Sequence, residues 1–409
     1  MKTVLILGAG PCQVPLIEKC RARGLRVLVA SRPGAYPGFD LADQAYRVDV
    51  RDKERLRAVA AAERVAAVLT DQTDIPVSTA AWIAERLGLP GIGYACAQKF
   101  TDKQCMRRAC AELGIPGPRY CVADRLAPLA QWADASGYPV IVKPVDSQGS
   151  RGVQLVRTPA ELAAAFAEAA PHAAAGQVLA EEFVAGREVV IQGFAAEGRF
   201  TNLVIGDRRY FNLPGRFIPQ ATLFPSTLAP ELQARLGDLN RRLVTGFGLP
   251  FGITHSEYLV RDDGDIRLVE VAARGGGVFI SSDLVPLACG VDVNDLLIRC
   301  ALGERPAFDP AALRPAAAGY VCFALPAGEI SRPPNAAELA ALPGVHRACL
   351  AGLTLGARVA DLSDKTGRQG PILLRAQSRA GLDALHRRVR ETLRVEVTTA
   401  AGVRGPVWD

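Results

Sequence analysis

The stretch YPVIVKPVDSQGSRGV, residues 138–153, decides which fold the sequence predicts. It starts as an apolar strand that ends on Lys143, and it continues as a loop rich in glycine and serine, Asp146–Gly152. A lysine at a strand end supplies a point charge, and a flexible loop supplies backbone N–H donors that close over an anion. This combination indicates a polyphosphate site. A plain hairpin has a similar composition, so the interpretation depends on the rest of the chain.

A second group of candidate residues lies in the run AEEFVAGRE, residues 180–188. An extended backbone at Glu182–Val184 can hydrogen-bond the edge of an adenine, and the Glu188 carboxylate can accept hydrogen bonds from ribose hydroxyls. A solvated acidic turn is the alternative. Together with the loop upstream, this run predicts a nucleotide site.

Two glutamates lie on strands that we expect to be neighbours. Glu257 and Glu270 stand on either side of the turn Asp262–Asp265, so an antiparallel hairpin brings their carboxylates together. Mg²⁺ takes few protein carboxylates and completes its shell with phosphate and water, so this pair predicts a magnesium site. Arg274 follows Glu270 by four residues and offers a guanidinium group to a phosphorylated intermediate.

Three further side chains are candidates for catalysis or substrate binding. His255 precedes Glu257 by two residues and therefore shares its strand face, where it would act on a substrate or a proton; a hydrogen-bonded core histidine is the alternative. Arg208 and Arg216 lie around a loop that joins two predicted strands. Arg216 can pair with a substrate carboxylate, although a surface arginine in a loop is the commoner outcome.

The first 98 residues alternate short apolar runs with helical patterns, which predicts a parallel, doubly wound sheet. Strands are expected at Thr3–Leu7, Leu25–Ala30, Tyr46–Val48 and Ala66–Thr70, and helices at Lys53–Ala61 and Val77–Leu87. Gly8-Ala9-Gly10 looks like the start of a dinucleotide fingerprint, but Gln13 stands where the third glycine belongs. We therefore do not expect NAD binding. A tight turn, or a loop whose amides face a small substrate, explains these glycines instead.

The rest of the chain reads as α+β, so the whole is expected to be an α/β protein. Helices are expected at Thr101–Leu113, Pro159–Ala170, Pro230–Thr245 and Ala380–Leu393, and strands within 178–204 and 253–271 and at Gly319–Ala324, Gly352–Arg358 and Ile372–Ser378. These patterns predict an N-terminal domain over 1–98, a central domain over 99–305 with a flap subdomain at about 118–188, and a smaller C-terminal lid over 306–409.

Composition excludes several classes of protein. With 409 residues, 49% of them hydrophobic and 22% charged, the chain buries large cores and is not mainly disordered. The net charge of +6 is scattered, which gives no support to nucleic-acid binding. The ten cysteines form no C-x-x-C pair, and neither a signal peptide nor an apolar run of about 18 residues is present. We expect a cytoplasmic protein without disulfides, zinc, nucleic-acid partners or a membrane anchor.

In this order, the parts resemble the ATP-grasp superfamily of ligases over almost the whole chain. The pattern consists of Lys103 after Thr101-Asp102, Lys143 with its loop, Glu181–Val184 with Glu188, and the carboxylate pair followed by an arginine. The resemblance implies ATP and Mg²⁺, with Mn²⁺ as a substitute, and often a homodimer. With the residues above, the expected ATP ligands are Lys103, Lys143, Ser147, Gly149, Ser150, Gly152, Glu181, Glu182, Phe183, Val184 and Glu188, the metal ligands are Glu257 and Glu270, the catalytic residues are Arg274, His255 and Arg208, and the substrate ligands are Arg216, Gly276 and Gly277.

Two departures from the family pattern bear on these expectations. Many members have asparagine two residues after the second glutamate, where this chain has Ala272, which weakens any case for a second magnesium ion. L-amino-acid ligase-like proteins and some purine-pathway carboxylases share the E-x-A-x-R pattern. Biotin carboxylase is similar in architecture, but Gly275-Gly276-Gly277 replaces its signature after the arginine.

The resemblance implies an ATP-dependent carboxylate–amine ligase. A carboxylate would attack the γ-phosphate to give an acyl phosphate and ADP, and an amine would then displace phosphate to form an amide. A purine-pathway type of carboxylase that uses bicarbonate is one alternative, and a nucleotide-binding regulatory protein without turnover is another. The carboxylate and amine substrates themselves are not predicted.

Overall fold

A parallel sheet with helices on both faces forms the N-terminal part of the computed structural model, which describes residues 1–146, 152–173, 176–213, 215–306 and 309–408. The sheet has the strand order β3-β2-β1-β4. Alternate residues of β1 enter two different cores, with Val4 and Ile6 on one face and Leu5 and Leu7 on the other. Because both faces are covered, β1 is apolar throughout, as expected of a parallel sheet. Its elements are β1 (Thr3–Leu7), α1 (Val14–Ala22), β2 (Arg26–Ser31), α2 (Pro37–Asp40), β3 (Gln44–Arg47), α3 (Lys53–Ala62), β4 (Ala67–Leu69) and α4 (Val77–Arg86).

Two helices lead from this sheet to a small antiparallel sheet that holds the lysine strand. In α6 the Asp102 carboxylate accepts a hydrogen bond from Cys105 N at 2.8 Å and caps the helix, which begins at Lys103, two residues after the expected start at Thr101. The small sheet has the order β5-β8-β6-β7, and α7 and α8 pack on it. The elements are α5 (Tyr94–Thr101), α6 (Lys103–Glu112), β5 (Tyr120–Ala123), α7 (Leu126–Ser136), β6 (Val140–Pro144), β7 (Gln154–Val156), α8 (Pro159–Ala169) and β8 (Val178–Glu182).

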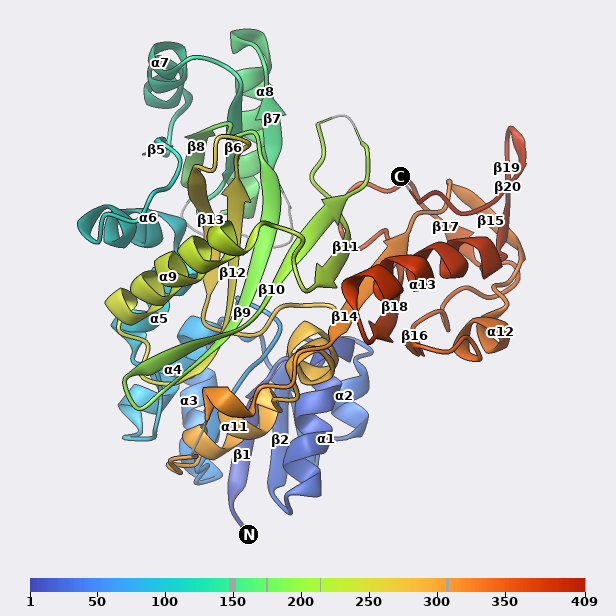
Figure 1. Cartoon of the computed structure of the whole chain (residues 1–409). Helices are drawn as coiled ribbons and strands as arrows, with labels where there is room; N and C mark the ends of the chain where they lie inside the picture. Colours follow the sequence, from blue (N-terminus) through green and yellow to red (C-terminus); the bar gives the residue numbers. More distant parts are fainter. Residues whose placement is uncertain (147–151, 174–175, 214, 307–308, 409) are drawn as a thin grey trace.

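An eight-stranded antiparallel sheet, in the order β13-β12-β9-β10-β11-β14-β18-β16, forms the centre of the molecule (Figure 1). It includes strands from both sides of residue 305, so the expected C-terminal lid shares a sheet with the central part. The domain boundaries stay a prediction. The elements are β9 (Arg187–Ala196), β10 (Arg199–Tyr210), β11 (Pro219–Phe224), α9 (Pro230–Phe247), β12 (Gly252–Val260), β13 (Ile266–Ala272), α10 (Val285–Cys289), α11 (Val293–Ala301), β14 (Ala317–Phe323), β16 (Val345–Ala348) and β18 (Gln369–Ala376).

The C-terminal part adds a third four-stranded sheet, in the order β17-β15-β19-β20, and the long helix α13. The predicted strand at Gly352–Arg358 is wrong. Leu353 N donates to Leu350 O, and Gly356 has a φ of +78°, so the chain turns there and only Arg358–Val359 pair as a strand. The remaining elements are β15 (Gly328–Arg332), α12 (Ala336–Ala340), β17 (Arg358–Val359), α13 (Arg379–Thr392), β19 (Glu396–Thr399) and β20 (Gly402–Arg404).

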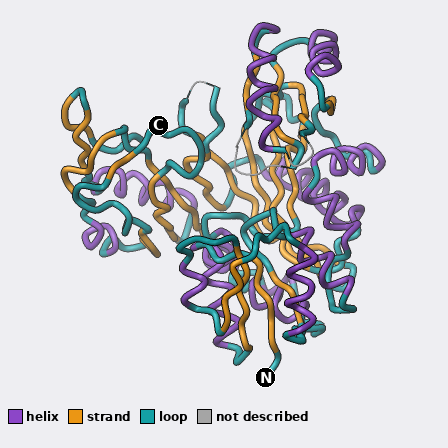
Figure 2. The backbone as a smooth tube through the Cα atoms, turned by 180° about the vertical axis from the view of Figure 1, so that it is seen from behind, coloured by secondary structure: helices purple, strands orange, loops and turns teal. Residues whose placement is uncertain are grey.

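The mixed α/β class predicted from the sequence is confirmed. Seen from behind, the small sheet with α7 and α8 stands on one side of the central sheet and the C-terminal elements extend from the other, with the parallel sheet below (Figure 2). Among the helices of the described ranges, none is both long and apolar enough to cross a membrane.

Candidate functional site

A cleft of about 540 Å³ opens between the small sheet and one edge of the central sheet. β6 and β8 contribute one wall, and β9, β10, β12 and β13 contribute the other. Its polar and charged lining is formed by Lys103, Lys143, Glu181, Glu182, Arg187, Glu188, Asp207, Arg208, Arg209, Tyr210, Thr227, Glu257, Arg267 and Glu270. The lysine strand, the hinge run and the carboxylate hairpin of the sequence prediction therefore meet in one place.

One end of the cleft holds a buried carboxylate between two cations. Arg107 Nε donates to Glu181 Oε1 at 2.7 Å, and Lys143 Nζ lies 2.5 Å from Glu181 Oε2. Burial alone would raise the pKa of Glu181, but the charges of Arg107 and Lys143 outweigh it and lower the pKa to about 2. For Lys143, burial lowers the pKa and the charge of Glu181 opposes that shift. These three side chains form a rigid group with a surplus of positive charge.

The hinge that follows β8 lines the cleft beside this group. Glu182 N donates to Arg119 O at 3.0 Å, and Phe183 N donates to Pro139 O at 3.2 Å, so two of its amides are held by protein carbonyls. The Glu182 carboxylate accepts from Arg119 Nε at 2.6 Å. The rings of Phe183 and Phe217 lie 6.5 Å apart, and both line the cleft. The hinge therefore presents aromatic surface and extended backbone, which suits a flat base.

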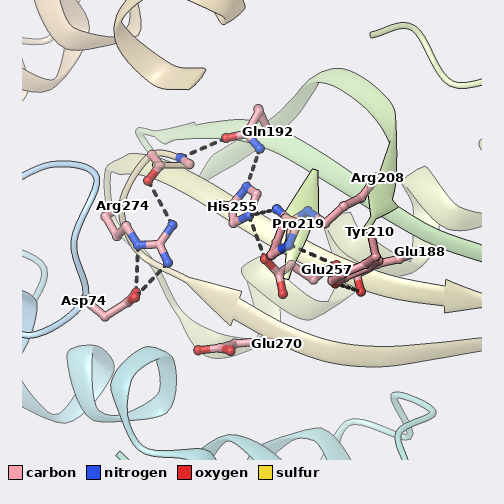
Figure 3. Close-up of polar contacts among 12 residues, drawn as sticks. Asp74, Glu188, Gln192, Arg208, Tyr210, Pro219, His255, Glu257, Glu270 and Arg274 are labelled. Atoms are coloured by element: carbon pink, nitrogen blue, oxygen red, sulfur yellow. Dashed lines mark hydrogen bonds and ion pairs between the residues drawn. The ribbon is translucent and has the colours of Figure 1, made fainter. Parts of the chain in front are cut away.

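At the other end of the cleft two partly buried carboxylates share one guanidinium group (Figure 3). Arg208 Nη1 donates to Glu188 Oε1 at 2.9 Å and also to Glu257 Oε1, and Tyr210 Oη donates to Glu188 Oε2. Burial, together with the charge of Glu257, raises the pKa of Glu188 to about 7 against the opposing charge of Arg208. Burial would also raise the pKa of Glu257, but Arg208 and the hydrogen bond from His255 hold it well below its usual range.

His255 lies between Glu257 and the fully buried Gln192 (Figure 3). Gln192 Oε1 accepts from Gly276 N at 3.2 Å, so its amide nitrogen faces His255 Nδ1. Burial lowers the pKa of His255 to about 4, which keeps the ring neutral near pH 7. This arrangement assigns the ring proton to Nε2, which lies 3.0 Å from Glu257 Oε1, with Arg208 Nη2 at 3.0 Å from the same nitrogen.

Glu257 and Glu270 are direct partners across the β12–β13 pair, and both line the cleft. Glu270 Oε1 lies 3.5 Å from Lys103 Nζ. Among the described residues, Arg208 and His255 contact the Glu257 carboxylate at Oε1, which leaves Oε2 for a cation. Within the described ranges no three His, Cys, Asp or Glu side chains gather as a metal cluster. Two carboxylates beside a phosphate site fit Mg²⁺, which keeps water and phosphate in its shell.

Arg274 is held by the N-terminal part of the chain. Its Nε and Nη2 donate to Asp74 Oδ1 and Oδ2, both at 2.7 Å, and its Nη1 donates to Gly275 O at 2.9 Å. Burial lowers the pKa of Arg274, but the charge of Asp74 outweighs it and the net shift is upward. These bonds use three of the five N–H groups of the guanidinium, and two remain for a substrate.

The loop after Arg274 is clamped by the same N-terminal segment. Asp71 accepts from Gly275 N at 2.8 Å and from Ser281 Oγ at 2.6 Å. Gln72 Oε1 accepts from Phe279 N at 2.8 Å. Val278 and Phe279 have φ values of +63° and +59°, a conformation that costs about 1–3 kcal/mol per residue and persists where surrounding contacts enforce it.

A Cβ atom on Gly276 would lie 3.0 Å from His255 Nδ1, so only glycine lets the loop approach the histidine. Arg216 is exposed, donates to Leu362 O at 2.9 Å and is not part of the cleft lining. Gly152 has a φ of +68° and lies beside Pro144. The expected flap ligands Ser147, Gly149 and Ser150 lie outside the described residues.

The structure adds charged residues that the sequence reasoning missed. Arg368 Nη1 donates to Pro219 O at 2.6 Å, and its guanidinium lies 5.6 Å from the centre of the Tyr320 ring. Burial and the charge of Arg274 lower the pKa of Lys365, and Asp74 opposes that shift. Of the residues that the sequence reasoning missed, only the segment Asp71–Asp74 could have been found from the sequence. It follows a predicted parallel strand, at the edge where such sheets bind ligands.

One segment of the chain matches a known family of domains. Residues 136–283 match the family model described as an ATP-grasp domain. Formate-dependent phosphoribosylglycinamide formyltransferase from Stenotrophomonas maltophilia is 31% identical over 185 residues, which are 44% of this chain and 47% of that protein. The chain thus matches about half the length of this curated relative.

Solved structures show the same fold over nearly the whole chain. L-amino acid ligase from Bacillus licheniformis has a TM-score of 0.83 at 22% identity and covers 98% of this chain and 99% of its own. N5-carboxyaminoimidazole ribonucleotide synthetase from Thermotoga maritima has a TM-score of 0.72 at 17% identity, covering 97% and 99%. Identities this low establish the fold alone.

Proposed function

Residues 136–283 match an ATP-grasp domain, and on that premise we propose that this chain is an ATP-dependent carboxylate–amine ligase that forms an amide through an acyl phosphate and releases ADP and phosphate. The observation that carries the proposal is the opposite charge of the two ends of the cleft. Lys143 and Arg107 leave a positive surplus beside Glu181, whereas Glu188 and Glu257 share Arg208. MgATP carries the complementary charges, because its phosphates are anionic and its metal ion is a cation.

In this proposal each part of the cleft holds one part of the nucleotide. The hinge at Glu182–Val184 and the Phe183 ring bind the base, and Glu188 binds the ribose. Lys143 and Lys103 bind phosphate oxygens, each as a compact charge. Mg²⁺ bound between Glu257 and Glu270 would neutralise phosphate charge. His255 donates its Nε2 proton toward Glu257 Oε1 and so fixes the orientation of that carboxylate.

Arg274 supplies a positive charge that can stabilise anions formed during the reaction. Asp74 fixes the guanidinium through two hydrogen bonds, so its two remaining N–H groups are oriented before substrate arrives. They are available to the acyl phosphate and to the oxyanion that forms when the amine attacks. Neither step requires a covalent enzyme intermediate, because the chemistry depends on positioning and charge.

A second candidate function is favoured by Lys365 and Arg368, two further cations near Arg274, since burial and the charges of Arg274 and Arg368 lower the pKa of Lys365. Such a pair suits a substrate that carries a phosphate group. In that case the chain joins formate or bicarbonate to a phosphoribosylated amine, as the names of the formyltransferase and synthetase relatives suggest. The expected homodimer stays a prediction.

An ADP-release screen tests both candidates. Amino-acid pairs, and formate or bicarbonate with phosphoribosylated amines, are supplied with MgATP. The ligase proposal expects ADP only when both a carboxylate and an amine are present, at a rate that Glu257→Gln abolishes. Lys365→Met separates the candidates, because it should raise KM for a phosphorylated amine and leave KM for amino acids unchanged. Wild-type ADP release no faster than that of Glu257→Gln, with every substrate, contradicts both and favours a regulatory protein.

A further inference from the structure

A second hollow, of about 960 Å³, lies outside the nucleotide cleft and shares no residue with it. The end of α10, the segment before β14, the turn before β16, the end of β18 and one face of α13 surround it. Figure 1 shows α13 running alongside β18 in this part of the molecule. The lining consists of Pro286, Leu287, Gly290, Arg314, Ala316, Pro343, Gly344, Arg375, Ala376, Gln377, Gly381, Ala384, Leu385 and Arg388.

The charged residues that line this hollow, called the groove below, are all positive. Arg314, Arg375 and Arg388 line it, and no aspartate or glutamate does. Throughout the described ranges, none of these three arginines has a carboxylate within 4.0 Å. The same helix pairs its arginines elsewhere, because Arg379 binds Asp207 at 2.8 Å and Asp383 at 3.2 Å. The groove therefore concentrates three uncompensated guanidinium groups that arise from three different segments.

The backbone around the groove is shaped to leave room between these groups. Gly381, Ala384, Leu385 and Arg388 occupy positions i, i+3, i+4 and i+7 of α13, so one helix face with small residues forms a wall. Gly344 has a φ of +97°, and a Cβ there would lie 2.7 Å from both Arg375 O and Leu385 Cδ2. Only glycine permits this close approach of the turn to β18 and α13.

We propose that this groove binds a small molecule that carries two or more phosphate-type anionic groups. Guanidinium groups form paired, charge-assisted hydrogen bonds to phosphate oxygens, and they lose less hydration energy than ammonium groups when they do so. Three like charges around one hollow repel one another, and a polyanion removes that repulsion. The apolar side chains of Pro286, Leu287 and Leu385 line the same hollow and accommodate the uncharged part of such a molecule.

The test measures binding of inorganic pyrophosphate by hydrogen exchange and calorimetry, without Mg²⁺. In the wild type, pyrophosphate should slow exchange in the turn at residues 343–344 and along α13. The double variant Arg375→Gln/Arg388→Gln should lose this protection and bind the groove at least about tenfold more weakly, a loss of 1.4 kcal/mol. Arg387→Gln is the matched control, because Arg387 is exposed on α13 and does not line the groove.

All replaced arginines are exposed, so the variants should fold, and an unchanged melting temperature checks this. Orthophosphate, with one phosphate group, should protect the same segments more weakly than pyrophosphate. Absence of protection in the wild type, undiminished protection in the double variant, or equal loss in Arg387→Gln overturns the proposal. Protection that accompanies a change in oligomeric state overturns it as well, because the groove is then an interface. The readout is independent of ADP release, so its failure leaves the proposed ligase function untouched.

Discussion

At one end of the nucleotide cleft a single buried carboxylate, Glu181, lies between Lys143 and Arg107, and at the other end two partly buried carboxylates, Glu188 and Glu257, share Arg208. Both groups combine glutamate with an arginine, and the first adds a lysine where the second adds another glutamate. The ratio of cations to anions differs. The two cations lower the pKa of Glu181 to about 2, despite its burial. Burial and a neighbouring carboxylate raise the pKa of Glu188 to about 7.

This difference indicates the charge of the ligand that each end would bind. The Glu181 group has a surplus cation and is complete without a ligand, so it is preorganised for an anion. The Glu188–Glu257 group has a surplus carboxylate, so it is stabilised when a cation arrives. The phosphates are therefore expected beside the Glu181 group, and the metal ion is expected at the Glu257 carboxylate in contact with those phosphates. The variants below test each group separately.

The largest effect is expected from Glu181→Gln. Removing this carboxylate leaves Arg107 and Lys143 buried without their anion, and breaking a buried ion pair in this way costs about 3–5 kcal/mol. Denaturant unfolding of the variant and the wild type measures the loss. Glu168→Gln, at an exposed glutamate of α8, is the control and should change stability little. A Glu181→Gln protein as stable as the wild type would show that this group is not a structural ion triad.

The next effect is on turnover. Glu257→Gln should lower ADP formation by roughly 10²-fold or more, since changes even to outer-shell partners of a metal site cost about 10–100-fold. The neutral amide keeps the shape of the side chain, so the melting temperature should change far less than the rate. Glu231→Gln, at an exposed glutamate of α9, is the matched control. Equal turnover in Glu257→Gln and Glu231→Gln would show that Glu257 is not a metal ligand.

A smaller effect is expected when Lys143→Met removes the cation that faces the phosphates. The dissociation constant of ATP should rise by about tenfold, close to the 1–3 kcal/mol of a lost charge-assisted hydrogen bond. Affinity for adenosine should stay unchanged, because the hinge at Glu182–Val184 binds the base. Competition binding with ATP and adenosine on the same preparation measures both. A parallel loss of both affinities would mean that Lys143 supports the fold of the cleft rather than the phosphates.

The last effect, the smallest for each single pH step, concerns acid pH. The pKa of Glu181 is depressed to about 2, below its unfolded value, so its stabilisation is present above about pH 4.5 and is lost as the pH falls toward 2. In that window the wild type should lose up to about 1.4 kcal/mol per pH unit more than Glu181→Gln. Urea unfolding at pH 5, 4 and 3 gives the two slopes. Parallel slopes would contradict the assigned ion pairs.

Local patterns predicted the carboxylate hairpin well. Glu257 and Glu270 are joined by the short turn Asp262–Asp265, and the observed register places them directly opposite each other. His255 shares the strand face of Glu257, and the two side chains are hydrogen-bonded. Alternation along a strand fixes such neighbours, which is why sequence spacing found them.

Contacts between distant segments were not predictable in the same way. Asp74 and Arg274 are 200 residues apart, and Arg107 meets Glu181 across 74 residues. Periodicity indicates that a residue is buried, but the topology decides which charge it meets. For the same reason the sequence predicted that Arg274 offers its guanidinium group to a phosphorylated intermediate, but it did not predict that Asp74 and Gly275 bind three of its N–H groups.

The most direct test of opposite charge at the two ends is the Mg²⁺ dependence of ATP binding, measured by calorimetry in the wild type and in Glu257→Gln. The account predicts that Mg²⁺ strengthens ATP binding by about tenfold or more in the wild type, a gain of at least 1.4 kcal/mol. In Glu257→Gln the strengthening should nearly disappear, while ATP without Mg²⁺ binds at least as tightly as before, because one negative charge has gone. Equal strengthening by Mg²⁺ in both proteins would contradict the assignment of the carboxylate end to the metal.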